Sequence, residues 1–258
     1  MNTLDDKEKI EKLRKLYLIK GRHSQYQLLA SNLQKIVKDG IPSKYKYEME
    51  RLDYIKKYVD FQNKTVLDIG GNTGYFTFEA CNLGVAHVDY YEGNQTHAEF
   101  VNLAAELLKF DDIVNVHSEY YLFEKNKKQY DIAILLNVLH HLGFDFRGGV
   151  TMGQAKKEIL NSINILAFHC KYIAFQIGFN WCGNINNCLF KHGTKKEVEN
   201  FVREGTKDHW MIKKIGIPVQ KNDKVAYEDV SLENNERNDA MGEFLNRPLF
   251  IMKSMLCD

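Results

Sequence analysis

Short apolar runs alternate with amphipathic stretches through the middle of the chain, and this alternation is its most regular pattern. The apolar runs are Thr65–Ile69, Ala86–Tyr91, Ile113–His117, Asp131–Leu136 and Tyr172–Ile177. Their brevity and nearly continuous apolar character are typical of strands that are covered on both faces. Segments with helical spacing, such as 96–108 and 154–167, lie between them. The pattern predicts an α/β fold with a Rossmann-like, mostly parallel sheet.

The first sixty residues have the periodicity of helices instead. One helix is expected to begin near Thr3, a second near Ser24, and a third to span about 44–59. We therefore expect an N-terminal helical cap over residues 1–60. The main domain is expected to occupy residues 61–258.

Two further strands are expected near the C-terminus, at His209–Val219 and Pro248–Lys253, which brings the predicted sheet to seven strands. The segment between them, Gln220–Arg247, is too polar for a core and too long for a tight hairpin. We expect an irregular insertion at about 220–247 that contacts the substrate.

Composition narrows the classes of protein to consider. Hydrophobic residues make up 44% of the 258 residues, which favours a folded core over disorder, and the formal net charge of +1 argues against a protein built mainly to grip nucleic acid. No apolar run approaches the length of a membrane span, and the N-terminus lacks the core of a signal peptide. We therefore expect a cytoplasmic protein with reduced cysteines.

A group of cysteines and histidines raises the question of a metal site. Cys182, Cys188 and His192 lie close together in the sequence, with His169 and Cys170 upstream. Their spacing differs from the common zinc patterns, which start from Cys-x2-Cys. We expect no metal.

The first apolar run continues into a glycine-rich segment that is typical of a nucleotide-like cofactor site. The candidate cofactor-binding residues in this segment are Asp68, Gly70, Gly71, Asn72 and Gly74. A dinucleotide site would have the order Gly-x-Gly-x-x-Gly, with a pyrophosphate at the helix N-terminus. Here an acid precedes the glycines. It would repel a pyrophosphate but suits a cofactor with an ammonium group.

A second acid, Glu92, ends the next predicted strand. Its separation from the glycine segment is about that at which an acid meets ribose hydroxyls in Rossmann-type sites. A carboxylate can accept from both vicinal hydroxyls. Asp89, earlier in the strand, is the alternative, and a purely structural strand-end acid is another.

The glycine segment resembles motif I of the class I S-adenosylmethionine (SAM)-dependent methyltransferases, and Tyr130–Leu142 resembles their motif IV. The resemblance covers about 60–180. It implies SAM as the cofactor, with Asp68 facing its methionyl end and Asn137 beside the methyl group. It also implies that Glu119 binds the adenine amino group, although an exposed loop carboxylate is a close alternative.

The residues after Asn137 bear on the acceptor. Methyltransferases that act on amino groups of DNA bases usually have a Pro-Pro pair here, whereas this chain continues Val138-Leu139-His140-His141. The segment therefore argues against amino-methylation of DNA and favours an oxygen acceptor, for which histidine is a suitable base. His140 and His141 are the candidate catalytic residues. A role in shaping the loop is the alternative.

Four residues are candidates for binding the substrate. Arg22 and Tyr26 precede a predicted helix and could hold a cofactor carboxylate or a substrate phosphate. Arg147 follows Asp145 on a glycine-bounded loop and could bind an anion, or it could be a solvated charge. Trp181 follows the fifth predicted strand.

The helical start with Gly21–Gln27 and the long insertion resemble methyltransferases of bacterial surface-polysaccharide pathways. This resemblance implies O-methylation of a polar, anionic acceptor, such as a phosphate, phosphoramidate or sugar hydroxyl of a capsular polysaccharide precursor. An RNA-modifying methyltransferase is one alternative, and it would need a basic face. A methyltransferase-like subunit that binds without turnover is another. The oligomeric state stays open.

Overall fold

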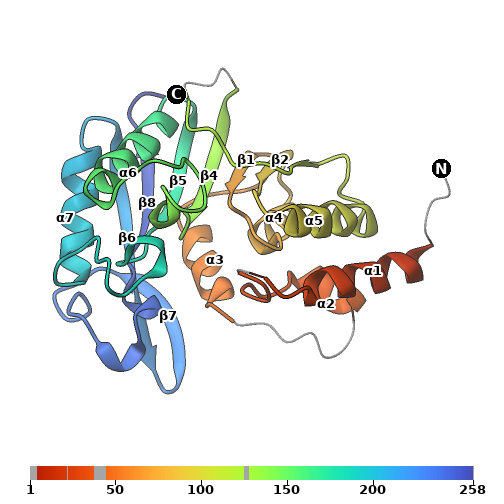
Figure 1. Ribbon diagram of the computed structural model, residues 1–258, viewed down its shortest axis with the longest axis horizontal. Helices are drawn as coiled ribbons and strands as arrows, with labels where there is room; N and C mark the ends of the chain where they lie inside the picture. The colour runs from red at the N-terminus through yellow and green to blue at the C-terminus, as the bar shows by residue number, and fades with distance from the viewer. Residues whose placement is uncertain (1–4, 22, 38–44, 125–127, 258) are drawn as a thin grey trace. The chain divides into compact units, whose positions relative to one another are not determined.

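The computed structural model describes residues 5–21, 23–37, 45–124 and 128–257 (Figure 1). Contacts along the chain define two compact units. The first unit contains the chain up to Glu48 together with Phe61–Tyr121, and the second unit contains Met49–Asp60 and Leu122–Asp258. The expected division into a cap of 1–60 and a main domain of 61–258 stays a prediction.

The first unit is built on three parallel strands in the order β3-β2-β1. Its elements are α1 (Asp6–Leu18), α2 (Ser31–Val37), β1 (Thr65–Ile69), α4 (Tyr75–Asn82), β2 (His87–Tyr91), α5 (Gln95–Leu108) and β3 (Val114–His117). Helix α4 packs against β1 and β2, while α1 packs on α5 through neighbouring Tyr17 and Phe100 rings. Because the three strands are parallel, their carboxyl ends lie at one edge, where ligands bind in open α/β sheets.

The second unit has five strands in the order β4-β5-β8-β6-β7. Strands β4 and β5 are parallel, and the pairs that involve β8 and β7 are antiparallel. Its elements are α3 (Glu48–Lys56, all but the first residue), β4 (Tyr130–Leu136), η1 (Leu139–His141), α6 (Met152–Leu166), β5 (Cys170–Gln176), η2 (Trp181–Gly183), α7 (Lys195–Thr206), β6 (Trp210–Lys221), β7 (Lys224–Asp229), η3 (Asp239–Met241), η4 (Phe244–Asn246) and β8 (Leu249–Ser254).

The predicted α/β, Rossmann-like fold class is confirmed, but the described residues form eight strands instead of seven. The additional strand is β7, inside the segment expected to be irregular. Asn222 and Asp223 connect it to β6 with φ angles of 51° and 60°. Two consecutive left-handed residues form a tight turn that matches the twist of a hairpin, and Asn and Asp tolerate this conformation well.

The predicted helices of the first sixty residues exist, but with different boundaries. Helix α1 is capped by Asp5 in a capping box with Glu8, whereas Thr3 lies outside the described residues. The second helix begins at Ser31 rather than Ser24, because left-handed backbone at His23 and Gln25 is incompatible with a helix. The third is shorter than expected. None of the helices in the described ranges is long and apolar enough to cross a membrane.

Candidate functional site

The glycine segment of the first unit is a tight turn between β1 and α4. Gly70, Asn72 and Gly74 all have positive φ angles of 67°, 52° and 77°. A Cβ atom on Gly71 would stand 2.5 Å from the Tyr90 ring and 2.7 Å from Oδ2 of Asp68. The backbone therefore approaches its neighbours at a distance that only glycine permits.

Asp68 is a buried acid at the base of this turn. Only 2% of it is exposed, and its Oδ2 accepts a hydrogen bond of 2.6 Å from the Thr77 hydroxyl. Burial raises the pKa of Asp68 to about 7; the bond from Thr77 opposes this effect and the charge of Glu92 adds to it. The carboxyl group is thus poised to ionise when a cation comes close.

Glu92 connects the two loops that follow β1 and β2. Its Oε2 accepts from the Asn72 amide and its Oε1 from the Asn94 amide, both at 2.9 Å. A carboxylate oxygen can accept more than one hydrogen bond, so Glu92 is a suitable group for a ligand hydroxyl. The alternative acid, Asp89, is buried within β2 and accepts from the His117 and Asn115 side chains. Glu92 therefore suits a ligand-binding role better.

The N-terminus of α4 is occupied by a side chain from a distant part of the sequence. Oε1 of Gln27 accepts from the Tyr75 amide at 2.9 Å and from the Thr73 hydroxyl at 3.3 Å. A pyrophosphate would bind at this place in a dinucleotide site. Sequence patterns did not reveal Gln27 as a site residue, because it reads equally well as a local capping partner of Ser24.

Two further predicted residues of the first unit, Tyr26 and Glu119, have no recorded bond to the glycine segment in the described part of the chain. Tyr26 is half-buried, with the His23 ring edge-on at 5.9 Å and the Lys46 ammonium 5.4 Å from its ring centre. Glu119 is exposed just beyond the end of β3. Arg22 lies outside the described residues.

Asn137 lies in the second unit, directly after β4, in a left-handed conformation with φ 61°. Its side-chain amide donates to Oε1 of Gln176 at 2.9 Å, and its Oδ1 accepts from Arg247 at 2.8 Å. The carboxamide is thus held from both sides. Arg247 was not recognised as a site residue from the sequence, since it is 110 positions away from Asn137.

The two adjacent histidines have different hydrogen-bond partners. Nδ1 of buried His140 accepts from the backbone amide of Gly178 at 3.3 Å. Because a backbone amide can only donate, this bond assigns the proton of neutral His140 to Nε2. His140 is therefore a hydrogen-bond donor at that nitrogen, which makes it a poor base there.

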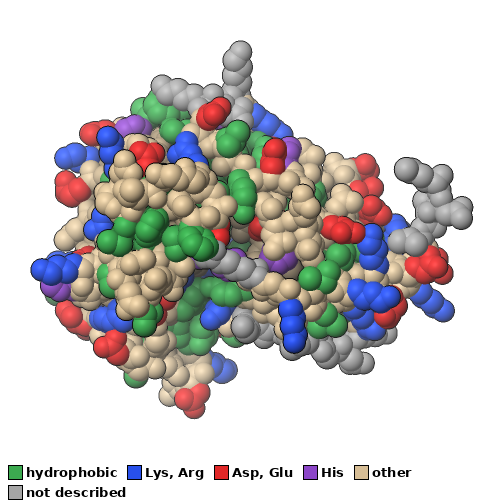
Figure 2. All heavy atoms as spheres, viewed as in Figure 1, with side chains coloured by type: hydrophobic (Ala, Val, Ile, Leu, Met, Phe, Trp, Pro, Cys, Tyr) green, Lys and Arg blue, Asp and Glu red, His purple; other side chains and the backbone are tan. Residues whose placement is uncertain are grey.

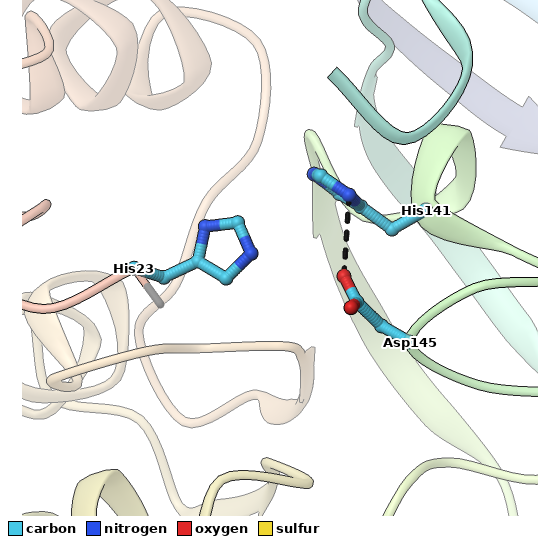
Figure 3. A group of neighbouring side chains, drawn as sticks. All are labelled: His23, His141 and Asp145. Carbon is cyan, nitrogen blue, oxygen red and sulfur yellow. Dashed lines mark ion pairs between the residues drawn. The ribbon is translucent and has the colours of Figure 1, made fainter. Parts of the chain in front are cut away.

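His141 has the arrangement expected of a base. Its Nδ1 lies 3.2 Å from Oδ2 of Asp145, and its other ring nitrogen points away from the carboxylate (Figure 3). A carboxylate at Nδ1 holds the proton on that atom and leaves Nε2 to accept one. The turn after η1 returns Asp145 to His141, because the Asp145 amide donates to the His141 carbonyl at 3.1 Å.

The other two predicted substrate residues differ in their surroundings. Nε1 of Trp181 donates to the Leu142 carbonyl at 2.7 Å, so this ring holds the turn that follows the histidines. Arg147 lies 3.8 Å from Glu158 of α6 and lines a groove of about 390 Å³ along that helix. The structure thus brings Trp181 to the histidine turn, while Arg147 contacts α6.

The residues of the first unit fit SAM better than a dinucleotide. The glycine turn admits close approach to backbone, Gln27 caps the helix where a pyrophosphate would bind, and Asp68 is a buried acid that a cofactor ammonium would stabilise in its ionised form. Glu92 could accept from ribose hydroxyls. SAM carries both the ammonium and the hydroxyls.

No protein-family model matches the chain, and no curated protein does. Among solved structures, the bifunctional kinase–methyltransferase WbdD matches 93% of this chain and 46% of its own, with a TM-score of 0.55 and 15% identity. A candidate rRNA methylase from Clostridium thermocellum matches 84% of this chain and 100% of its own, with a TM-score of 0.50 and 12% identity. At such identities these likenesses show the fold alone, an α/β, Rossmann-like fold that this chain shares with those methyltransferases.

Proposed function

We propose that the protein is a SAM-dependent O-methyltransferase. The observation that carries this proposal is the buried Asp68 beneath a glycine turn, because an acid with a pKa raised to about 7 has a cation as its natural partner. The Gln27 cap supports the choice of SAM over a dinucleotide. Bound SAM supplies a methyl group activated by its sulfonium.

In this proposal the second unit acts on the acceptor. His141, oriented by Asp145, removes the proton of an acceptor hydroxyl through Nε2. His140 donates a hydrogen bond through its own Nε2 and helps to orient the acceptor. Methyl transfer needs in-line alignment and exclusion of water beyond this proton transfer.

The acceptor we propose is polar and anionic, such as a phosphate, phosphoramidate or sugar hydroxyl of a surface-polysaccharide precursor. The resemblance of Gly21–Gln27 to enzymes of those pathways supports this choice. Gln27 of that segment caps α4 beside the glycine turn, which ties the segment to the proposed cofactor site.

An RNA acceptor is the second candidate, because one structural neighbour is a candidate rRNA methylase. A net charge of +1 does not favour it. On the face shown in Figure 2, positive and negative side chains are interspersed rather than gathered into one basic patch. Such a mixed face offers a phosphate backbone little net attraction.

Methyl-labelled SAM and a panel of acceptors would test the proposal. The panel contains phosphate monoesters, a phosphoramidate, nucleotide-linked sugars and bulk RNA. We expect label in a small anionic acceptor, and its loss with His141→Ala. Transfer to RNA alone would replace the proposed acceptor class. SAM binding without turnover on any panel member would favour the non-catalytic alternative.

A further inference from the structure

The connection between β7 and β8 places a buried arginine, Arg247, at the carboxyl ends of β4 and β5. Arg247 precedes β8, which runs antiparallel to β5 and pairs Leu249 with Gln176. Only 7% of Arg247 is exposed, and its carbonyl accepts from the Gln176 side chain at 3.0 Å. These contacts fix the arginine beside Asn137, the residue that follows β4.

Arg247 has more donors than the described residues use. Its Nε and Nη2 donate to the two carboxylate oxygens of Glu243 at 3.0 and 2.6 Å, and its Nη1 donates to Asn137 at 2.8 Å. A guanidinium has five N–H donors, so two remain. The Asn137 amide keeps one more, since it donates once, to Gln176. Buried donors are costly without an acceptor, so this place is suited to a ligand that accepts several hydrogen bonds.

The charges around the arginine favour an anion as that ligand. Burial raises the pKa of Glu243, but hydrogen bonds and charge from Arg247 outweigh this effect and hold the pKa below its ordinary value. The two therefore form an ion pair. A second buried guanidinium, Arg51, lies 5.3 Å from the Phe244 ring, and Arg247 lies 5.0 Å from the same ring.

Gly178 brings this arginine and one of the candidate catalytic histidines to a common point. A Cβ atom at Gly178 would lie 3.1 Å from Nε2 of His140 and 3.2 Å from Cζ of Arg247. Both side chains therefore border the space next to the Cα atom of this glycine. An anion bound to Arg247 would lie next to the histidine turn.

We propose that Arg247 and Asn137 bind a terminal oxyanion of the methyl acceptor, a phosphate monoester or a carboxylate. This inference rests on the proposed function and names the group that would hold the acceptor in place. The depth of Arg247 selects a terminal group, since a phosphodiester within RNA is flanked by nucleotides on both sides. Bidentate contact from a guanidinium suits such oxyanions.

Binding of inorganic phosphate tests the inference directly. Line broadening in ³¹P NMR would follow the ion on the full chain in the presence of S-adenosylhomocysteine, with acetate as the carboxylate probe. We expect Arg247→Gln to weaken binding about tenfold or more, because charge-assisted hydrogen bonds are lost. Asn137→Asp should weaken it too, since a carboxylate there would compete for the guanidinium. Lys221→Gln is the control: it removes a positive charge from the second unit, but Lys221 pairs with Glu228 on the hairpin of β6 and β7.

The outcomes separate this inference from the proposed function. Equal phosphate binding by the native chain and Arg247→Gln, or no binding by the native chain, would overturn the inference. Displacement of phosphate by an RNA oligomer, dependent on Arg247, would overturn the choice of a terminal group. If the native chain does not bind S-adenosylhomocysteine, the result counts against the proposed function itself. If Arg247→Gln does not fold, Arg247→Lys can replace it. This variant keeps the charge but removes the bidentate guanidinium, and we expect it to bind phosphate more weakly as well.

Discussion

At the scale of single residues, the two halves of the proposed chemistry depend on carboxylates with opposite surroundings. Asp68 is buried, and its carboxyl group accepts hydrogen bonds from the neutral hydroxyl and backbone amide of Thr77. Asp145 is paired with an imidazole at 3.2 Å. In the proposed function Asp68 pairs with a cation of the ligand, whereas Asp145 already orients the imidazole of His141. The two acids should therefore respond differently to pH and to substitution.

The raised pKa of Asp68, about 7, predicts a pH-dependent cofactor affinity. A cofactor ammonium prefers the ionised carboxylate, so affinity for S-adenosylhomocysteine should rise as the pH increases from about 5.5 to 7, by at most tenfold per pH unit. Stability without ligand should move the other way over this range, because the folded state holds the proton more tightly than the unfolded state.

Asp68→Asn should remove both trends and weaken cofactor binding, while it keeps an acceptor for Thr77. Calorimetric titration and urea unfolding across the pH range measure these effects. A flat affinity profile in the native chain would refute the role given to this acid.

The His141–Asp145 pair predicts a selective loss of turnover. Asp145→Asn should lower kcat about 10²- to 10⁴-fold with little change in cofactor affinity, because the imidazole loses its orienting charge. Steady-state rates against pH would record the loss. Asp131→Asn, which removes an acid paired with Lys171, serves as the control and should keep its activity. Unchanged kcat in Asp145→Asn would assign the pair a structural role.

At the scale of elements, segments distant in sequence complete what local patterns begin. Helix α4 follows directly from β1, yet its cap comes from Gln27. Asn137 follows directly from β4, yet Arg247 holds its side chain. Periodicity located most strands and helices to within a few residues, because burial on a sheet face is a local property of sequence. It could not supply these pairings, which depend on topology.

The cap on α4 predicts a measurable contribution to stability. Gln27→Ala leaves the Tyr75 amide and the Thr73 hydroxyl without their shared acceptor and should cost about 1–2 kcal/mol of unfolding free energy. Gln27→Glu restores an acceptor at a helix N-terminus and should recover most of this loss. Urea denaturation would compare the three proteins, and equal stabilities would argue against the cap.

The hairpin of β6 and β7 shows where local interpretation was wrong. The polar segment that follows β6 predicts irregular structure, but Asn222-Asp223 forms a two-residue turn. Strand β7 lies at the edge of its sheet in the order β8-β6-β7, where polar side chains can face water. Polarity was thus a consequence of edge position rather than of irregular structure.

At the scale of the whole molecule, the fold class followed from the sequence, but the acceptor does not follow from the fold. The alternating pattern and the glycine turn are shared across class I methyltransferases, which act on many acceptors. The two proposed acceptor classes differ in how methyl transfer should depend on salt, because RNA binds largely through its phosphates. The near-neutral charge of this chain favours the small acceptor.

Methyl transfer to a small anionic acceptor should fall only modestly between about 50 and 200 mM salt. An enzyme that neutralises six or more RNA phosphates would lose about 10³- to 10⁵-fold in affinity over the same range. Initial rates at subsaturating acceptor would show which holds, with ionic strength varied at constant pH. A steep fall would favour RNA.

The central claim is that the glycine turn of this chain binds SAM and not a dinucleotide. Isothermal titration with S-adenosylhomocysteine and, separately, with NAD tests it most directly. We predict one-to-one binding of S-adenosylhomocysteine that weakens in Glu92→Gln, and no binding of NAD, because Gln27 caps α4 and Asp68 repels a pyrophosphate. Binding of NAD, or absence of heat with S-adenosylhomocysteine, would contradict the account.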